Sequence, residues 1–143
     1  MSSPAEHQQY YIGVKAVIVQ DDELLLIRRS DYGSWDVPGG RINVGETPEA
    51  TLYREIPEEL PGARVVSNPQ LLHAEQPDFT LPDGNSLMLL FYAVEVEVPT
   101  YAITSDEHIE VMFATKESFG EITTQSPIMQ AAKGALTRYG FLD

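Results

Sequence analysis

The sequence has no cysteine among its 143 residues, so disulfides, thiolate metal sites and cysteine nucleophiles are excluded. Basic residues are also few: nine Lys and Arg stand against 22 Asp and Glu, which gives a formal net charge of −13. Long nucleic acids and anionic membrane surfaces both require a basic footprint on their partner. We therefore expect this chain to bind neither.

Long apolar segments are missing as well. The longest apolar run covers residues 87–94, far short of the roughly 20 residues that a membrane-spanning helix needs. The amino-terminal residues show no basic region and no apolar stretch of the signal-peptide type, so we expect no membrane association and a cytoplasmic location. Because there is no repeat, low-complexity tract or linker, residues 1–143 are predicted to form one domain, with residues 1–9 as a flexible tail.

What the sequence does contain is a regular series of apolar segments. Residues 11–20 and 23–30 are predicted to form a β-hairpin that turns at Asp21-Asp22. Their continuous apolar character indicates a sheet that is covered on both sides. Further strands are predicted in residues 63–75, in residues 79–98 as a hairpin turning at Pro82-Asp83-Gly84, and in residues 109–114.

Two helices are predicted, each by a hydroxyl cap followed directly by proline, at Thr47-Pro48 and at Ser126-Pro127. The predicted apolar faces are Leu52, Tyr53, Ile56 and Leu60 on the first helix, and Ile128, Ala132, Ala135, Leu136 and Tyr139 on the second, which ends at Gly140. The order of strands, helix, strands and helix predicts an α/β fold in which helices cover both faces of a sheet.

The first predicted helix gathers negative charge on one face. Glu55, Glu58 and Glu59 stand at positions i, i+3 and i+4, and like charges at these spacings destabilise a helix by a few tenths of a kcal/mol per pair, roughly. No lysine at i+4 offsets this cost, whereas a divalent cation such as Mg²⁺ or Mn²⁺ would. A plain acidic helix face is the alternative. Gly39-Gly40 favour the cation, because glycines let the backbone approach a metal or ligand closely.

The spacing of Gly40, Glu46 and the segment Arg54-Glu55-Ile56-x-Glu58-Glu59 resembles the signature of the Nudix hydrolases, with seven of its nine specified positions filled in register. The resemblance extends over roughly residues 12–140. It implies a Nudix-like α/β/α sandwich, with a mixed β-sheet and helices on both faces. It also implies a loop–helix–loop that holds divalent metal, Mg²⁺ or Mn²⁺.

The resemblance implies roles for individual residues of this segment. The metal ligands would be the Gly40 carbonyl, Glu55, Glu58 and Glu59. One of these three glutamates would act as the base toward water, and Glu58, Glu55 and Arg54 are predicted as catalytic residues. Arg54 would orient a glutamate through a charge-assisted hydrogen bond, with Glu46 supporting it. A further ligand or base would come from Glu107 or Glu110, with Glu110 favoured and a surface charge as the alternative in each case.

The implied reaction is hydrolysis of the pyrophosphate bond in a nucleoside diphosphate linked to another moiety. The substrate would be a sugar nucleotide such as ADP-ribose, or a nucleoside triphosphate. Arg28, Arg29 and Arg41 suit bidentate binding of its phosphates, with surface arginines as the alternative reading. Phe79 suits stacking on a base, as do Trp35 and Tyr92, with a place in the core as the alternative. A homodimer is left open.

Two prolines depart from the expected pattern. Pro57 lies inside the predicted helix, where proline removes a backbone donor and costs about 3 kcal/mol or kinks the helix. Pro61 stands where the signature has glycine, and Gly62 follows one residue late. We therefore expect a reshaped helix end. This expectation motivates the alternative hypothesis, a catalytically weak Nudix-fold protein that binds or senses nucleotides.

Overall fold

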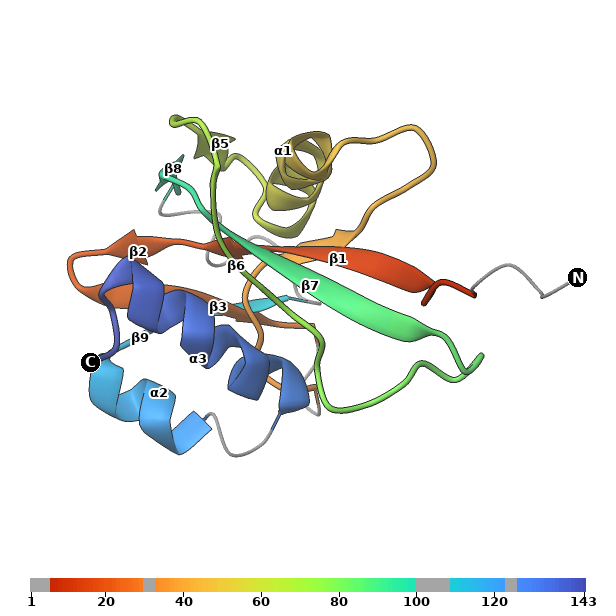
Figure 1. Cartoon of the computed structure of the whole chain (residues 1–143). Helices are drawn as coiled ribbons and strands as arrows, with labels where there is room; N and C mark the ends of the chain where they lie inside the picture. The colour runs from red at the N-terminus through yellow and green to blue at the C-terminus, as the bar shows by residue number, and fades with distance from the viewer. Residues whose placement is uncertain (1–5, 30–32, 100–108, 123–125) are drawn as a thin grey trace, which may run out of the picture.

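The computed structural model describes residues 6–29, 33–99, 109–122 and 126–143 (Figure 1). Residues 1–5 of the predicted tail, and Glu107, lie outside the described residues. Among the residues described, no helix has the length and apolar character that crossing a membrane requires.

The central sheet is mixed, as predicted. Its strand order is β4-β1-β7-β6, in which β1 (Tyr10–Val17) and β7 (Ser86–Ala93) run parallel. The outer strands β4 (Gly39–Arg41) and β6 (Gln70–Glu75) are antiparallel to their neighbours. β1 therefore has paired neighbours on both sides, and it carries Gly39 and Gly40 beside its own middle, at Lys15 and Val14.

A second sheet is formed by β2 (Val19–Gln20), β3 (Glu23–Arg28) and β9 (Glu110–Ala114), all antiparallel. The predicted turn at Asp21-Asp22 is present, with positive φ angles of 51° and 63°. The hairpin predicted between residues 11–20 and 23–30 is only partly right. Of residues 11–20, the strand that pairs with β3 is β2, at Val19 and Gln20. β1 belongs to the central sheet instead, where it pairs with β4 and β7.

The predicted hairpin over residues 79–98 is also only partly right. The turn exists, since the Gly84 N–H donates to the Leu81 carbonyl at 2.8 Å. However, β7 pairs with β1 along its whole length and with β6 over residues 89–93. The segment before the turn contributes one bridge, Thr80 to Ser86. A short third sheet joins β5 (Arg64–Val65) to β8 (Val96–Glu97). The strands predicted in residues 63–75 and 109–114 are present.

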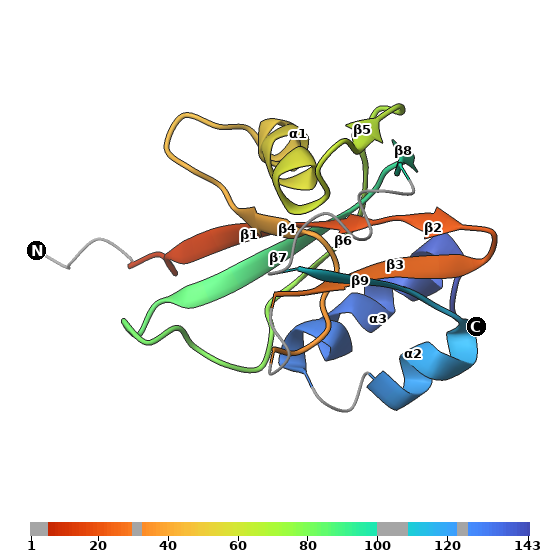
Figure 2. The ribbon, with the colours of Figure 1, turned by 180° about the vertical axis from the view of Figure 1, so that it is seen from behind.

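Helices cover both faces of the sheets, as predicted. α1 (Pro48–Glu59) lies on one face together with the β5–β8 pair, and α3 (Pro127–Tyr139) lies on the other with α2 (Lys116–Ile122) (Figures 1 and 2). The predicted caps are present at Thr47, which accepts from the Ala50 N–H at 3.1 Å, and at Ser126. α2 was not predicted from the sequence.

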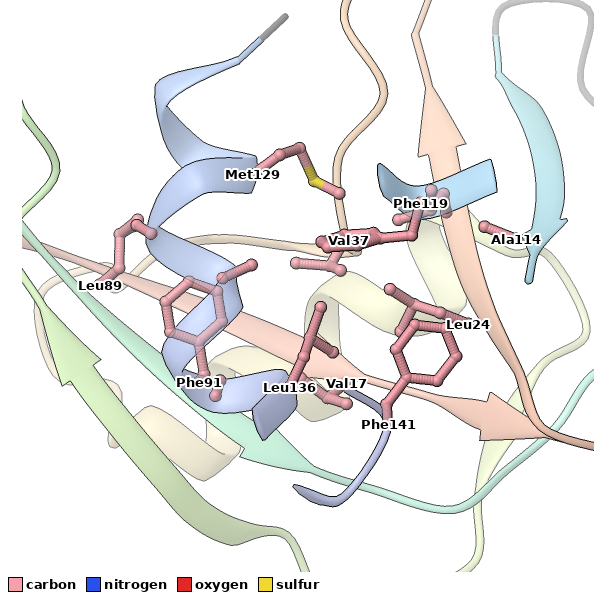
Figure 3. Packing of buried hydrophobic residues seen from close by; sticks show 14 of the residues in the cluster. Val17, Leu24, Val37, Leu89, Phe91, Ala114, Phe119, Met129, Leu136 and Phe141 are labelled. Atoms are coloured by element: carbon pink, nitrogen blue, oxygen red, sulfur yellow. The ribbon is translucent and has the colours of Figure 1, made fainter. Parts of the chain in front are cut away.

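Two apolar clusters fill the space between the layers. The larger lies under α3 and includes Val17, Leu24, Phe91, Met129 and Leu136 (Figure 3). The other lies under α1 and includes Val14, Leu25, Leu52, Ile56 and Leu60. β3 sends alternate residues into each cluster, with Leu24 and Leu26 in the larger and Leu25 and Ile27 in the other. This alternation explains its continuous apolar run.

The predicted apolar faces of the two long helices are wrong at one residue each. Tyr53 on α1 and Tyr139 on α3 are 48% and 42% exposed, whereas the other members of each face are buried or partly buried. Both tyrosines stand at the edge of the helical stripe, where spacing alone does not separate the core from solvent.

Candidate active site

The loop that enters α1 brings two glycines against its carboxylates. The Gly39 N–H donates to Glu59 Oε1 at 2.8 Å. At Gly40 an added Cβ would lie 2.3 Å from Glu55 Oε1, closer than any real Cβ contact. Glycine at position 40 is therefore required if the Glu55 carboxylate is to lie against the backbone of β4.

Arg54 holds two of the carboxylates in place. Its Nε donates to Glu46 Oε2 at 2.7 Å, its Nη2 to Glu46 Oε1 at 2.9 Å and its Nη1 to Glu55 Oε1 at 2.5 Å. The Arg54 hydrogen bond, aided by the Asn43 N–H, lowers the pKa of Glu46 to about 2. This two-pronged ion pair fixes the guanidinium, which in turn orients Glu55.

Glu58 and Glu59 have opposite environments although they are adjacent. The Glu58 side chain is 63% exposed, with Oε2 3.8 Å from Arg54 Nη1. Glu59 is buried and accepts from Arg29 Nη2 at 2.7 Å. Burial raises the pKa of Glu59 to about 7, against the lowering effects of the Gly39 N–H and of the Arg29 and Lys15 charges. The helix thus offers one solvated and one buried carboxylate at its end.

The α1 carboxylates suit a divalent cation in their chemistry. Glu55, Glu58 and Glu59 supply carboxylate oxygens, and Glu55 Oε1 lies against the Gly40 backbone. Carboxylate and carbonyl oxygens are the hard donors that Mg²⁺ and Mn²⁺ prefer. In the part of the chain that the structure describes, no three His, Cys, Asp or Glu side chains converge as ready ligands. Glu55 and Glu59 are instead paired with Arg54 and Arg29.

α1 continues unbroken through Pro57. The helix is regular to Glu59, and the Leu60 N–H donates to the Ile56 carbonyl at 2.8 Å. The chain then turns at once, because the Ala63 N–H donates to the Leu60 carbonyl at 2.8 Å with Gly62 at φ 85°. Proline at the second position and glycine at the third are the residues that a type II turn prefers. The predicted reshaping of the helix end is this turn, and Glu58 and Glu59 stay on the helix.

Two cavities lie beside the Gly39-Gly40 segment, one lined by Gly39 and the other by Gly40. The first, of about 270 Å³, is polar and is lined by the charged residues Lys15, Arg29, Asp36 and Glu59. The second, of about 260 Å³, is mostly apolar and is lined by Gly13, Phe79, Leu81, Leu87, Leu89 and Ile128, with Gly40, Arg41 and Lys15 also contributing. Lys15 lines both cavities.

The predicted substrate-binding residues separate into two groups. Arg29 lines the polar cavity, and Arg41 and Phe79 line the apolar one. The Arg41 guanidinium carbon also lies 5.2 Å from the centre of the Tyr11 ring. Their contact with phosphate or base remains a prediction.

Arg28 and Glu110 face one another instead. Arg28 Nη2 donates to Glu110 Oε2 at 2.6 Å across the β3–β9 pair, and its guanidinium lies 4.6 Å from the centre of the Trp35 ring. Neither Arg28 nor Glu110 lines the two cavities. Tyr92, a further stacking candidate, is buried in the cluster under α1.

Lys15 and Asp36, which line the polar cavity, were not predicted from the sequence. Lys15 Nζ lies 2.7 Å from Asp36 Oδ2, and its side chain is 11% exposed. A lysine within the apolar run of residues 12–19 is the signal that could have identified it, because a buried lysine needs a partner.

Comparison with known proteins identifies the family. The NUDIX domain model matches residues 9–132. A MutT-like protein of Streptomyces ambofaciens is 45% identical over 64 residues, which are 45% of this chain and 40% of that protein. A putative 8-oxo-dGTP diphosphatase of Bacillus subtilis (strain 168) is 44% identical over 43 residues, 30% of this chain and 29% of that one. The chain thus spans less than half the length of these curated relatives.

A solved structure agrees over most of the chain. The MutT NUDIX hydrolase from Burkholderia pseudomallei superposes with a TM-score of 0.68 at 25% identity, covering 92% of this chain and 98% of that one. This similarity extends the agreement from the signature to the whole sandwich. Since the family model matches residues 9–132, most of its length, the chain belongs to the NUDIX domain family.

Proposed function

We propose that this protein hydrolyses the pyrophosphate bond of a nucleoside diphosphate linked to another moiety, with Mg²⁺ or Mn²⁺ as cofactor. The observation that carries the proposal is the meeting of three features at Gly39-Gly40: the α1 carboxylates, a polar cavity and an apolar cavity. Hydrolases of this family generally need a divalent metal. The metal would be held by the Gly40 carbonyl, Glu55, Glu58 and Glu59.

The chain's own residues have separate tasks in this reaction. When bound, a divalent cation neutralises phosphate oxygens and lowers the pKa of water. Arg54 keeps the Glu55 carboxylate against the Gly40 backbone. Glu58, being solvated, is free to accept a proton from water. Arg29 presents a guanidinium to phosphate in the polar cavity.

The two cavities fit the two ends of a nucleotide. The apolar cavity offers Phe79 and three leucines to a planar base, and the polar cavity offers cations to phosphate. A sugar nucleotide such as ADP-ribose and a nucleoside triphosphate both satisfy this division. The Arg28–Glu110 pair remains a prediction for substrate binding and catalysis. A cytoplasmic location and a homodimer also remain predictions.

The proposal is tested with a panel of substrates. The protein is incubated with Mg²⁺ or Mn²⁺ and sugar nucleotides, dinucleoside polyphosphates or nucleoside triphosphates, and the products are separated by ion-exchange chromatography. We expect a nucleoside monophosphate or a related phosphate product from at least one class. Absence of turnover with every class would refute the proposal.

A second candidate function rests on a specific observation. Glu55 and Glu59 are already paired with Arg54 and Arg29, and the described residues contain no ready cluster of three ligands. This arrangement favours a nucleotide-binding or sensor protein with little catalysis. Calorimetry separates the two functions, because nucleotide binding without hydrolysis and with weak metal affinity supports the sensor.

A further inference from the structure

Lys15 occupies an unusual place in the fold. It lies in the middle of β1, where its Cα partner across the ladder is Gly39, the residue whose N–H binds Glu59. The flanking residues Val14 and Ala16 are completely buried in the cluster under α1. Lys15 points to the opposite face of the strand, and it lines both the polar and the apolar cavity.

Asp36 holds the Lys15 ammonium in a fixed position. Asp36 Oδ2 lies 2.7 Å from Nζ, and Asp36 Oδ1 accepts from the Val37 N–H at 2.7 Å. The Asp36 backbone also exchanges two hydrogen bonds with Ile27, at 2.8 and 2.9 Å. Because the Asp36 carboxylate and backbone are both held by hydrogen bonds, Asp36 orients Lys15 before any ligand binds.

The ammonium keeps capacity for a ligand. An ammonium carries three N–H donors, and among the residues that the structure describes Asp36 is its one hydrogen-bond acceptor. The other described cation of the polar cavity, Arg29, is 65% exposed and is paired with Glu59. Lys15, with 11% exposure, is therefore the deeper positive charge of the two.

The neighbouring residue on the same face of β1 is Gly13, which has no side chain. A Cβ there would lie 3.0 Å from Leu89 Cδ2 and 3.6 Å from Leu87 Cδ1, so Gly13 leaves room in the apolar cavity. A ligand with a planar apolar part over Gly13 and an anionic part in the polar cavity would pass Lys15 at the junction. A nucleoside monophosphate unit has this shape.

We propose that Lys15 is a substrate-binding residue whose ammonium, positioned by Asp36, binds the phosphate attached to the nucleoside. This inference rests on the proposed nucleotide substrate. A purely structural ion pair would hold the Asp36 segment to β1 but would not distinguish a nucleotide from its nucleoside. The difference between these two ligands is therefore the quantity to measure.

The test uses binding without metal or turnover. AMP, GMP, CMP and UMP, and their four nucleosides, are titrated into the protein in EDTA and followed by NMR. For the wild type we expect the best-bound monophosphate to bind at least about tenfold more tightly than its nucleoside, the effect of one charge-assisted hydrogen bond. In Lys15→Met this ratio should fall toward one, while the affinity for the nucleoside is unchanged.

Matched variants separate charge and folding from the specific contact. Lys133→Met removes one positive charge at an exposed site on α3 and should keep the wild-type ratio. Lys15→Met alone leaves the Asp36 carboxylate charged without its partner, which can prevent folding. The double variant Lys15→Met with Asp36→Asn removes both charges and replaces the single variant in that case. We expect it to lose the ratio as well.

Three results would overturn the inference: an unchanged ratio in both Lys15 variants, an equal loss of nucleotide and nucleoside binding, or a wild type without preference for the monophosphate. These results are distinguishable from a failure of the proposed function. A wild type that hydrolyses the substrate panel while Lys15→Met keeps the ratio refutes this inference alone. A wild type that binds phosphate through Lys15 without turnover refutes the hydrolase alone.

Discussion

At the scale of single residues, the site depends on one close contact, between the backbone of Gly40 and the Glu55 carboxylate. A Gly40→Ala variant would place a methyl group 2.3 Å from Glu55 Oε1. The carboxylate is the end of a flexible side chain, so we expect it to move and the fold to persist. A displacement of about 1 Å near the reaction can lower the rate about 100-fold. The measurement is kcat on the preferred substrate, with the melting temperature recorded alongside.

Gly120 offers the matched control for this variant. It lies in α2, and an added Cβ there meets no atom within 4 Å. Gly120→Ala should leave kcat unchanged and should stabilise the protein by about 0.5–1 kcal/mol, because alanine loses less entropy in a helix. If Gly40→Ala retained full activity, the contact between Gly40 and Glu55 would have no part in catalysis.

The Glu46–Arg54 ion pair gives a prediction for pH. Its hydrogen bonds lower the pKa of Glu46 from 4.5 to about 2 in the folded protein. The stabilisation is therefore complete above pH 4.5 and is lost as the pH falls toward 2. Thermal melts of the wild type and Glu46→Gln should differ most at pH 6, with the gap narrowing by pH 3. Exposed Glu6, changed to Gln, is the control, and a gap independent of pH would contradict the prediction.

Single residues also show which features of the site can be predicted from the sequence and which cannot. The spacing of Glu55, Glu58 and Glu59 predicted a shared helix face, because local geometry alone determines it. The pairing of Lys15 with Asp36 depends on two segments that meet only in the folded chain, 21 residues apart. The sequence therefore could not predict that contact. The contact with Asp36 is what allows the Lys15 ammonium to be buried.

At the scale of elements, α1 shows how a helix tolerates an internal proline. Pro57 lacks the N–H that would donate to the Tyr53 carbonyl, yet the helix continues to Glu59. Pro57→Ala restores this donor, so we expect the free energy of unfolding to rise by about 1–3 kcal/mol. Urea denaturation measures the change. Pro48→Ala at the first helical position should have little effect, because that N–H has no partner in the helix. A Pro57→Ala protein no more stable than the wild type would contradict this account.

Strand β1 leads to a prediction about the apolar cavity. Gly13→Val places side-chain atoms where the added Cβ alone would already lie 3.0 Å from Leu89 Cδ2. The cavity of about 260 Å³ should shrink, and nucleoside affinity should fall by about tenfold. In NMR titrations the affinity for inorganic pyrophosphate should be unchanged, since the polar cavity is lined by other residues. Unaltered nucleoside binding would exclude this cavity as the base site.

The elements themselves were predicted better than their partners. The caps of α1 and α3 and the turn at Asp21-Asp22 come from neighbouring residues, and they are present as predicted. The pairing of β1 with β7 joins residues that are 76 positions apart in sequence, such as Tyr10 and Ser86, and no local pattern encodes it. Both predicted hairpins were therefore only partly right, since strands that are neighbours in sequence pair often but not always.

At the scale of the whole molecule, the sandwich brings the site together from separate parts of the chain. β1 supplies Lys15, the loop before β4 supplies Asp36, and α1 supplies the carboxylates, all on or beside the central mixed sheet. The order of apolar segments predicted a sheet with helices on both faces. The strand order of the central sheet, β4-β1-β7-β6, could be learned only from the structure. The site thus combines a local sequence motif, residues 40–59, with Lys15 and Asp36, which only the folded chain brings beside it.

One measurement tests the central claim most directly: the rate of hydrolysis of the preferred substrate with Mg²⁺ and with EDTA, in the wild type, Glu58→Gln and Glu59→Gln. Exposed Glu117 on α2, changed to Gln, is the matched control. We predict turnover that requires the metal, falls at least about 100-fold in Glu58→Gln and Glu59→Gln, and is unchanged in the control. Turnover that persists in EDTA, or that is equal in Glu58→Gln, Glu59→Gln and the wild type, would contradict the account.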